Sequence, residues 1–449
     1  MTAQVGVIGS GAAGMAAAFR LQQAGWRVRM LEAEDHLGGR MYTTEKDGFI
    51  LDHGATILTS RYRHLLGIIS DAELGGELVS AGSSLGIARD GEIHSFDGAR
   101  LVRDFLGSRL ISTRSKLKLA GLARDVLRAR KEFDAADLSY ADTFDTQSAG
   151  DYARLRLNRE IYDYLVEPST GALHGGRADE VSVVSLFFCL EKFFGTKFFA
   201  FRRGMGTYPQ LLGRRFDVEL GARVLCVEEQ AGGVDVTWQG SDGLERTESM
   251  AGCVVAVPGR AVPPMLPGLD PWRADFLGHV KYAKCVVGHI ALSRRPTSIP
   301  ATYIMGAPAS DPGILSFTME HNHVPGRVPP GKGMVSVYSD SAWAEELMAD
   351  DDDGVSKKFV EAMDRMIPGS ANDVEFAVIK RWDVLGPTTP PGYWRDMRRF
   401  NEIRRGRDTL IQLAGDYFAT SKMESTTASG ERAARDLLAR LTPSQCPRA

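Results

Sequence analysis

A glycine-rich turn near the N-terminus constrains this chain more than any other feature. Residues 4–9 form a short apolar run rich in β-branched residues, which predicts a buried strand, and an Ala-rich helix follows to about Gln23. Gly9, Gly11 and Gly14 fall in the turn between them. The first glycine of such a turn permits its tight bend, the second lets the backbone approach a pyrophosphate, and the third lets helix and strand pack closely. The spacing predicts a βαβ unit with a dinucleotide at the helix N-terminus.

The second strand of this unit ends in an acid. After Gly25 ends the helix, Val28 to Glu32 is the next buried run. A carboxylate at that position can accept hydrogen bonds from the ribose hydroxyls of a dinucleotide. Strand, helix, second strand and terminal acid in register make the motif far more specific than the glycines alone.

Length and composition limit the class of protein. The 449 residues are too many for one hydrophobic core, so we expect two domains. The formal net charge of −3 does not indicate a nucleic-acid partner, and no apolar run approaches the roughly 20 residues that span a bilayer. The N-terminus also lacks the basic region of a signal peptide. Scattered cysteines predict reduced thiols, no metal site and a cytoplasmic location; they are Cys189, Cys226, Cys253, Cys285 and Cys446.

The residues after the acid narrow the cofactor. Gly38-Gly39-Arg40 follows Glu32, and Leu51-Asp52-His53-Gly54-Ala55 comes shortly afterwards. Both segments resemble the flavin-containing amine oxidase and protoporphyrinogen oxidase superfamily. The resemblance implies that the Gly-Gly-Arg turn brings an arginine and backbone amides to the phosphates of FAD. It also implies that the second segment passes beside the isoalloxazine ring.

The resemblance extends over most of the chain. The segment 413–416 and the helix expected from about Met423 are similar to the second flavin motif of the family. In that motif an acid, here Asp416, contacts the ribityl-phosphate arm, and the helix points its dipole at the flavin pyrimidine. The other similar segments are residues 201–207, 223–225 and 253–258.

FAD is therefore the implied cofactor. We expect it to be bound non-covalently, because the neighbourhood of the second motif lacks a cysteine for attachment. The residues implied to bind it are Gly9, Gly11, Ala13, Gly14, Glu32, Ala33, Gly39, Arg40, Gly54, Ala55, Thr56, Val224, Val257, Gly415, Asp416, Met423 and Glu424.

The expected fold class is α/β. The resemblance implies a Rossmann-like FAD-binding domain with an inserted substrate domain of mixed β-sheet plus helices. Alternating residues at 222–238 also predict a hairpin that turns at Gly232-Gly233. We expect residues 1–62, 205–283 and 383–449 to form the FAD-binding domain, and residues 63–204 and 284–382 to form the substrate-binding domain.

Three enzyme classes share this scaffold: amine oxidases, porphyrinogen oxidases, and desaturases acting on carotenoids or cyclic carbonyl compounds. Residues 167–186 and the segment 109–133 resemble the porphyrinogen-oxidase version of the substrate domain. The latter predicts an amphipathic helix with eight Arg and Lys residues, which could meet anionic lipid but more commonly forms a solvated face. Lys284 resembles the amine-oxidase lysine that holds a water next to flavin N5.

Two departures argue against an amine substrate. Amine oxidases often flank the amine with aromatic rings, and the position before the Met-Glu of the second flavin motif is here Lys422. A cation would repel a protonated amine and attract a carboxylate. The second ring position aligns with Leu385, which has no π face for a cation. These residues favour a neutral or acidic ring compound.

Our leading interpretation is desaturation of a carboxylate-bearing alicyclic ketone, such as a 4-oxocyclohexanecarboxylate. A base would remove the proton α to the carbonyl while hydride goes to flavin N5, and dioxygen would be reduced to hydrogen peroxide. Porphyrinogen oxidation, amine oxidation and a non-enzymatic structural or sensing flavoprotein are the alternatives. The candidate catalytic residues are Lys284, Tyr393, Lys422 and Tyr417, with Tyr42, Tyr208, His53 and His174 as weaker candidates.

The expected partners are few. We expect a small-molecule substrate and dioxygen, no nucleic acid, no membrane contact, and a monomer or homodimer.

Overall fold

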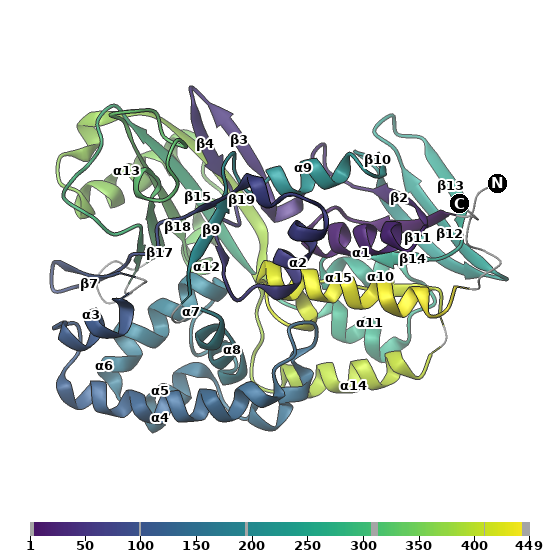
Figure 1. Cartoon of the computed structure of the whole chain (residues 1–449), viewed down its shortest axis with the longest axis horizontal. Coiled ribbons are helices and arrows are strands. Elements are labelled where there is room, and N and C mark those ends of the chain that lie inside the picture. The colour runs from purple at the N-terminus through teal and green to yellow at the C-terminus, as the bar shows by residue number, and fades with distance from the viewer. Residues whose placement is uncertain (1–3, 98–99, 194–195, 307–312, 408, 442–449) are drawn as a thin grey trace.

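Two sheets and a layer of helices make up the protein (Figure 1). The computed structural model describes all residues except 1–3, 98–99, 194–195, 307–312, 408 and 442–449. A parallel sheet with its helices occupies the right of Figure 1, a larger sheet the upper left, and the helices α3 to α6 the lower left.

The parallel sheet is built around the N-terminal βαβ unit. β1 (Gln4–Ile8) lies between β2 (Arg27–Leu31) and β14 (Cys253–Val255), and α1 (Ala12–Gln23) connects β1 to β2 as the glycine spacing predicts. All pairings in this sheet are parallel. β10 (Asp217–Glu219) and β20 (Ile411–Leu413) are the edge strands.

Side chains alternate between the two faces of this sheet. Val5, Val7 and Val254 join a core with α1 and with α15 (Met423–Leu438). Cys253 and Val255 join a core on the opposite face. The first face also carries α2 (Arg63–Asp71) and α9 (Thr207–Gly213). The second carries β11 (Arg223–Gln230), β12 (Gly233–Gln239), β13 (Glu245–Met250), α10 (Val262–Met265), α11 (Pro271–Gly278) and α14 (Tyr393–Arg405). The predicted hairpin at 222–238 is confirmed as β11 and β12.

The larger sheet has the order β19-β15-β18-β17-β16-β7-β8, and its pairings are antiparallel except β16 with β7. α12 (Ser341–Leu347) and α13 (Asp352–Met366) pack on one face. Its strands are β19 (Val374–Pro387), β15 (Tyr282–Leu292), β18 (Gly333–Ser339), β17 (Ile314–Met319), β16 (Tyr303–Met305), β7 (Leu85–Arg89) and β8 (Glu92–Phe96).

Helices form the third layer. The basic amphipathic helix predicted at 109–133 is confirmed as α4 (Thr113–Ala129), which the η4 turn (Arg130–Glu132) extends. Among the described residues, no helix combines the length and apolar character needed to cross a membrane. The other helices of this layer are α3 (Leu101–Gly107), α5 (Ala149–Arg156), α6 (Arg159–Ile161), α7 (Glu167–His174) and α8 (Val183–Phe193).

Short strands tie the layers together. β3 (Thr43–Lys46) and β4 (Phe49–Asp52) form a hairpin, and β9 (Phe198–Phe201) pairs with β5 (Leu58–Thr59) and β6 (Leu78–Ser80).

The domain division stays a prediction, and two strands cross its expected boundaries. β15 begins at Tyr282 and β19 ends at Pro387, whereas we expected boundaries at 283/284 and 382/383. These two residues are themselves ladder partners, so the sheet continues past the expected boundaries.

Candidate cofactor and substrate site

A cavity of about 1570 Å³ runs between the parallel sheet, the larger sheet and the helices. Sites for one drug-sized ligand measure roughly 300–1,000 Å³, so this cavity has room for more than one small molecule. The residues that we expected to bind FAD line it, apart from Gly14 and Glu424: they are Gly9, Gly11, Ala13, Glu32, Ala33, Gly39, Arg40, Gly54, Ala55, Thr56, Val224, Val257, Gly415, Asp416 and Met423.

The glycine turn has the geometry that its spacing predicts. Gly9 has a φ of +92°, a left-handed conformation that favours glycine. A Cβ on Gly14 would lie 1.8 Å from the carbonyl oxygen of Gly9, so helix and strand meet too closely for any side chain. A Cβ on Gly11 would meet nothing within 4 Å. The backbone at Gly11 is thus open to a ligand at the N-terminus of α1.

Glu32 is held at the cavity wall by the glycine turn. Its Oε2 atom accepts hydrogen bonds from the backbone N–H of Ser10 at 2.8 Å and from the Ser10 hydroxyl at 2.5 Å. Its Oε1 atom accepts the N–H of Glu34 at 3.0 Å. The Ser10 oxygen in turn accepts the N–H of Gly38 at 3.0 Å, which joins the glycine turn to the Gly-Gly-Arg turn.

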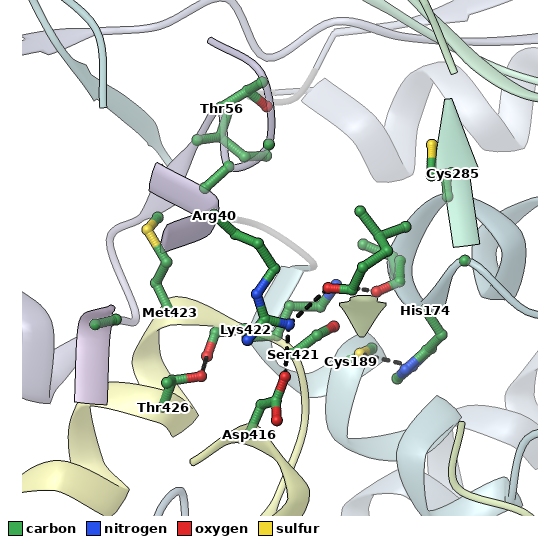
Figure 2. A pocket seen from close by; sticks show the side chains of 18 of the residues that line it. Arg40, Thr56, His174, Cys189, Cys285, Asp416, Ser421, Lys422, Met423 and Thr426 are labelled. Atoms are coloured by element: carbon green, nitrogen blue, oxygen red, sulfur yellow. Dashed lines mark hydrogen bonds and ion pairs between the residues drawn. The ribbon is translucent and has the colours of Figure 1, made fainter. Parts of the chain in front are cut away.

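Arg40 and Asp416 bring the two flavin motifs together. The guanidinium Nη1 lies 2.6 Å from the Asp416 carboxylate and donates to the carbonyl oxygen of Leu385 at 2.7 Å. The Asp416 side chain is buried, whereas that of Arg40 is 29% exposed on the cavity side. Figure 2 shows this pair beside Thr56, Met423 and Lys422.

The N-terminus of α15 opens on the same cavity. Met423 and Thr426 line it, and the N-cap residue, Lys422, has no side-chain oxygen to cap the first-turn N–H groups. The positive end of the helix dipole therefore faces the cavity.

Glu424 lies elsewhere than we expected, and its assignment as a cofactor residue needs correction. Its carboxylate accepts the backbone N–H groups of Arg63, His64 and Leu65 at 2.6, 3.0 and 3.1 Å. These are the first N–H groups of α2, which lack intrahelical partners. The side chain thus caps α2 and is not part of the cavity lining.

These features together fit FAD. An open backbone at Gly11, an acid beside the turn, an arginine on the cavity side of a buried aspartate, and a helix N-terminus suit an extended anionic dinucleotide. In the described part of the chain, no group of three or more His, Cys, Asp or Glu residues is placed to hold a metal ion.

Beyond the cofactor residues the cavity continues into what we call the apolar lobe. It lies between α4, α8 and the larger sheet. Its side chains come from elements far apart in sequence, and few of them are charged; they are Leu119, Leu122 and Val126 of α4, Leu186 and Leu190 of α8, and Leu85, Ile87, Met305 and Leu315 of the sheet. The apolar face of the basic amphipathic helix therefore borders a cavity.

Lys422 does line the cavity, close to a cysteine and a histidine. Its ammonium donates to the carbonyl oxygen of Leu173 in the last turn of α7. Cys189 and His174 also line the wall, with the Cys189 Sγ 3.2 Å from the His174 Nε2 (Figure 2). Burial lowers the pKa of Lys422, and burial together with the Lys422 charge lowers the pKa of His174 to about 3.

Three other candidate catalytic residues are not in the described cavity lining. Lys284 is partly exposed and forms ion pairs with Glu345 at 3.5 Å and Asp383 at 3.8 Å. Tyr393 and Tyr417 are buried in the core behind the parallel sheet, where the Tyr393 hydroxyl donates to the carbonyl oxygen of Tyr417. A direct role beside the flavin does not follow from these positions.

The weaker candidates divide in the same way. Tyr42, Tyr208 and His53 are also outside the described lining, whereas His174 belongs to it. The aromatic residues that do line the cavity come from other segments. They are Tyr62, Phe96, Phe105, Phe198, Tyr303, Tyr338 and Trp382.

Comparison with known proteins identifies the family. The chain matches the flavin containing amine oxidoreductase family over residues 12–438. A coproporphyrinogen III oxidase of Bacillus subtilis is 23% identical, with 96% of this chain and 97% of the relative covered. The mitochondrial protoporphyrinogen oxidase of Nicotiana tabacum is 29% identical over 43% of this chain. In that match and in one to a Staphylococcus aureus coproporphyrinogen III oxidase, the chain spans only 37% and 40% of the relatives.

Solved structures agree on the fold. A cyclohexylamine oxidase from Brevibacterium oxydans superposes with a TM-score of 0.77 at 16% identity, covering 98% of this chain and 100% of the other. A putrescine oxidase bound to putrescine gives 0.78 at 16% identity, again covering 98% and 100%. The chain belongs to the flavin-containing amine oxidoreductase family and is an FAD-dependent oxidoreductase.

Proposed function

We propose that this enzyme removes hydride from a C–H bond of a large, mainly apolar ring compound, and that porphyrinogens are the first class to test. FAD, when bound, supplies the hydride acceptor. The observation that carries the proposal is the apolar lobe, which provides a long wall of leucine, isoleucine and methionine side chains next to the cofactor residues. Such a wall stabilises a bound apolar ring in proportion to the area buried.

The relatives support the same class. The Bacillus subtilis coproporphyrinogen III oxidase matches nearly the whole length of this chain. Segment-level similarity to a plant protoporphyrinogen oxidase points in the same direction.

A cyclic ketone is the second candidate, because Lys422 lies on the cavity wall. Its N–H groups can bind a carbonyl or carboxylate oxygen of the substrate. However, burial lowers the pKa of this lysine, which weakens the argument that rests on its charge. A small cyclohexane ring would also leave most of the apolar lobe unfilled.

Amines have the weakest support. Both positions that carry aromatic rings in many amine oxidases, Lys422 and Leu385, line the cavity without a π face. A protonated amine would therefore lose that contact at both positions.

Anaerobic reduction of the flavin tests these classes. We expect a porphyrinogen to bleach the oxidised flavin band, a 4-oxocyclohexanecarboxylate to do so more slowly, and primary amines and polyamines to have no effect. Bleaching by amines alone would contradict the proposal. Bleaching by dithionite alone would support a structural or sensing flavoprotein.

A bulky substitution in the apolar lobe provides a size test. Leu122→Trp should lower kcat/KM for a porphyrinogen by roughly 10–200-fold, the effect of one misfit in an apolar pocket, while flavin content stays unchanged. Activity on the small ketone should change little. Equal loss on both substrates would show that the lobe does not select for size.

The attachment of FAD and the electron acceptor are further parts of the proposal. We propose non-covalent FAD and reduction of dioxygen to hydrogen peroxide. Cys189 and Cys285 do line the cavity, so acid precipitation is the decisive check. Free flavin in the supernatant is expected, and flavin in the pellet would show a covalent bond.

A further inference from the structure

Lys422 occupies an unusual position for a lysine. It precedes the first residue of α15, yet its side chain crosses to the last turn of α7, where it donates to the carbonyl oxygen of Leu173. A carbonyl at a helix C-terminus favours a cation or an N–H donor. The same side chain lines the cavity, so a ligand there can reach the amine.

The surroundings of Lys422 favour its neutral form. The cavity wall beside it carries the Cys189 thiol and the His174 imidazole, which contact each other at 3.2 Å. Burial disfavours the ammonium and lowers the pKa of Lys422, and burial raises the pKa of Cys189, so the thiol stays protonated near neutral pH. The pKa of His174, at about 3, leaves its ring neutral as well.

A desolvated lysine with an accessible neutral form is a nucleophile toward carbonyl carbon. We propose that Lys422 captures aldehydes and ketones in the cavity as an imine. The amine nitrogen attacks the carbonyl carbon, the oxygen takes up the two amine protons, and water leaves as the C=N bond forms. No electrons are exchanged in this step.

This reaction would deepen the second candidate function, on which its catalytic meaning rests. A protonated imine withdraws electrons from the adjacent carbon more strongly than a ketone does, so the α proton becomes easier to remove. His174 and Cys189 would take no covalent part. They would hold the amine in a poorly solvated wall.

Two other lysines in the cavity lining serve as internal controls. The ammonium of Lys116 donates to the carbonyl oxygens of Leu106 at 2.8 Å and Ser108 at 2.5 Å. The ammonium of Lys380 lies over the rings of Tyr42 and Trp382, at 5.3 and 4.9 Å. Both meet the same ligand, but neither has the thiol and imidazole neighbours of Lys422.

Reductive trapping tests the proposal. The holoenzyme is incubated near neutral pH with 4-oxocyclohexanecarboxylate, sodium cyanoborohydride is added, and peptides are mapped by mass spectrometry. We expect a secondary-amine adduct on Lys422 that exceeds those on Lys116 and Lys380 by about tenfold for each unit by which its pKa lies lower. Equal labelling of the three lysines, or none at Lys422, would overturn the proposal.

Lys422→Arg is the matched variant, because a guanidinium can still donate to the Leu173 carbonyl but forms no imine under these conditions. The adduct should vanish from this position while the bound flavin stays. If the variant does not fold, the ratio among the three lysines in the wild-type protein still decides. Flavin bleaching by a porphyrinogen needs no carbonyl, so failure of trapping and failure of the proposed function give different results.

Discussion

The glycines of the first turn do different work, although the sequence motif treats them alike. Gly14→Ala would place a Cβ 1.8 Å from the Gly9 carbonyl oxygen, whereas Gly11→Ala would place one in open space. We expect Gly14→Ala to lose roughly 1–3 kcal/mol of stability through overpacking, together with bound flavin. Gly11→Ala should keep its melting temperature in the flavin-free state and lose flavin affinity alone. Thermal unfolding and the flavin absorbance per protein separate the two effects, and equal melting temperatures for the two flavin-free variants would contradict this account.

Two buried histidines make stability depend on acid. Burial lowers the pKa values of His53 and His174 to about 3, against a usual value of 6.5. The unfolded chain therefore takes up protons first as the pH falls, so stability is complete above about pH 6.5 and declines toward pH 3. Each site contributes a slope of about 1.4 kcal/mol per pH unit within that window. The melting temperature measured against pH should fall less steeply for His174→Gln, and an unchanged slope would rule out His174 as a contributor.

At the scale of elements, α15 serves two sites at once. Its N-terminus faces the cavity, while Glu424 in its first turn caps α2 through three backbone N–H groups. We expect Glu424→Ala to cost about 1–3 kcal/mol, because buried N–H groups lose their acceptor. Glu402→Ala on α14, where the exposed side chain pairs only loosely with Arg398 at 3.7 Å, is the matched control. Similar unfolding midpoints in urea for the two variants would contradict the capping role.

The elements that sequence predicts well are those whose cause is local. β1, α1 and β2 follow from glycine spacing and apolar runs, and the β11–β12 hairpin follows from alternation around Gly232-Gly233. Most cofactor residues were placed through the resemblance to a family, and the cavity wall includes nearly all of them. Whether they contact FAD stays a prediction.

Other features depend on what packs opposite, and the sequence does not state that. The period of α4 shows an apolar face, but only the placement of α8 and the larger sheet makes that face a cavity wall. The same reason explains Glu424 and Lys284, whose side chains point to α2 and to surface acids. A motif fixes where the backbone goes, and the neighbouring layer decides where each side chain ends.

At the scale of the whole molecule, a buried ion pair joins the layers. Asp52 and Arg327 lie 2.6 Å apart, and each side chain is 1% exposed. Asp52 also accepts the N–H of Met205 at 2.8 Å and the hydroxyl of Thr43, while Arg327 donates to the carbonyl oxygen of Phe201. The pair therefore links the β3–β4 hairpin, the chain entering α9, and the loop before β18, so it stiffens the frame around the cavity.

A double-mutant cycle measures how much this joint contributes. Asp52→Leu and Arg327→Leu should each cost about 3–5 kcal/mol, since each leaves the other charge buried without its partner. The double variant leaves neither charge, so its cost should fall below the sum of the two by about 0.5–3 kcal/mol. Free energies of unfolding from urea titration, followed by far-UV circular dichroism, give the cycle, and flavin fluorescence reports the cavity in the same samples. If the costs add, the two charges act independently. If the singles also retain flavin at wild-type affinity, the joint does not hold the cavity in shape.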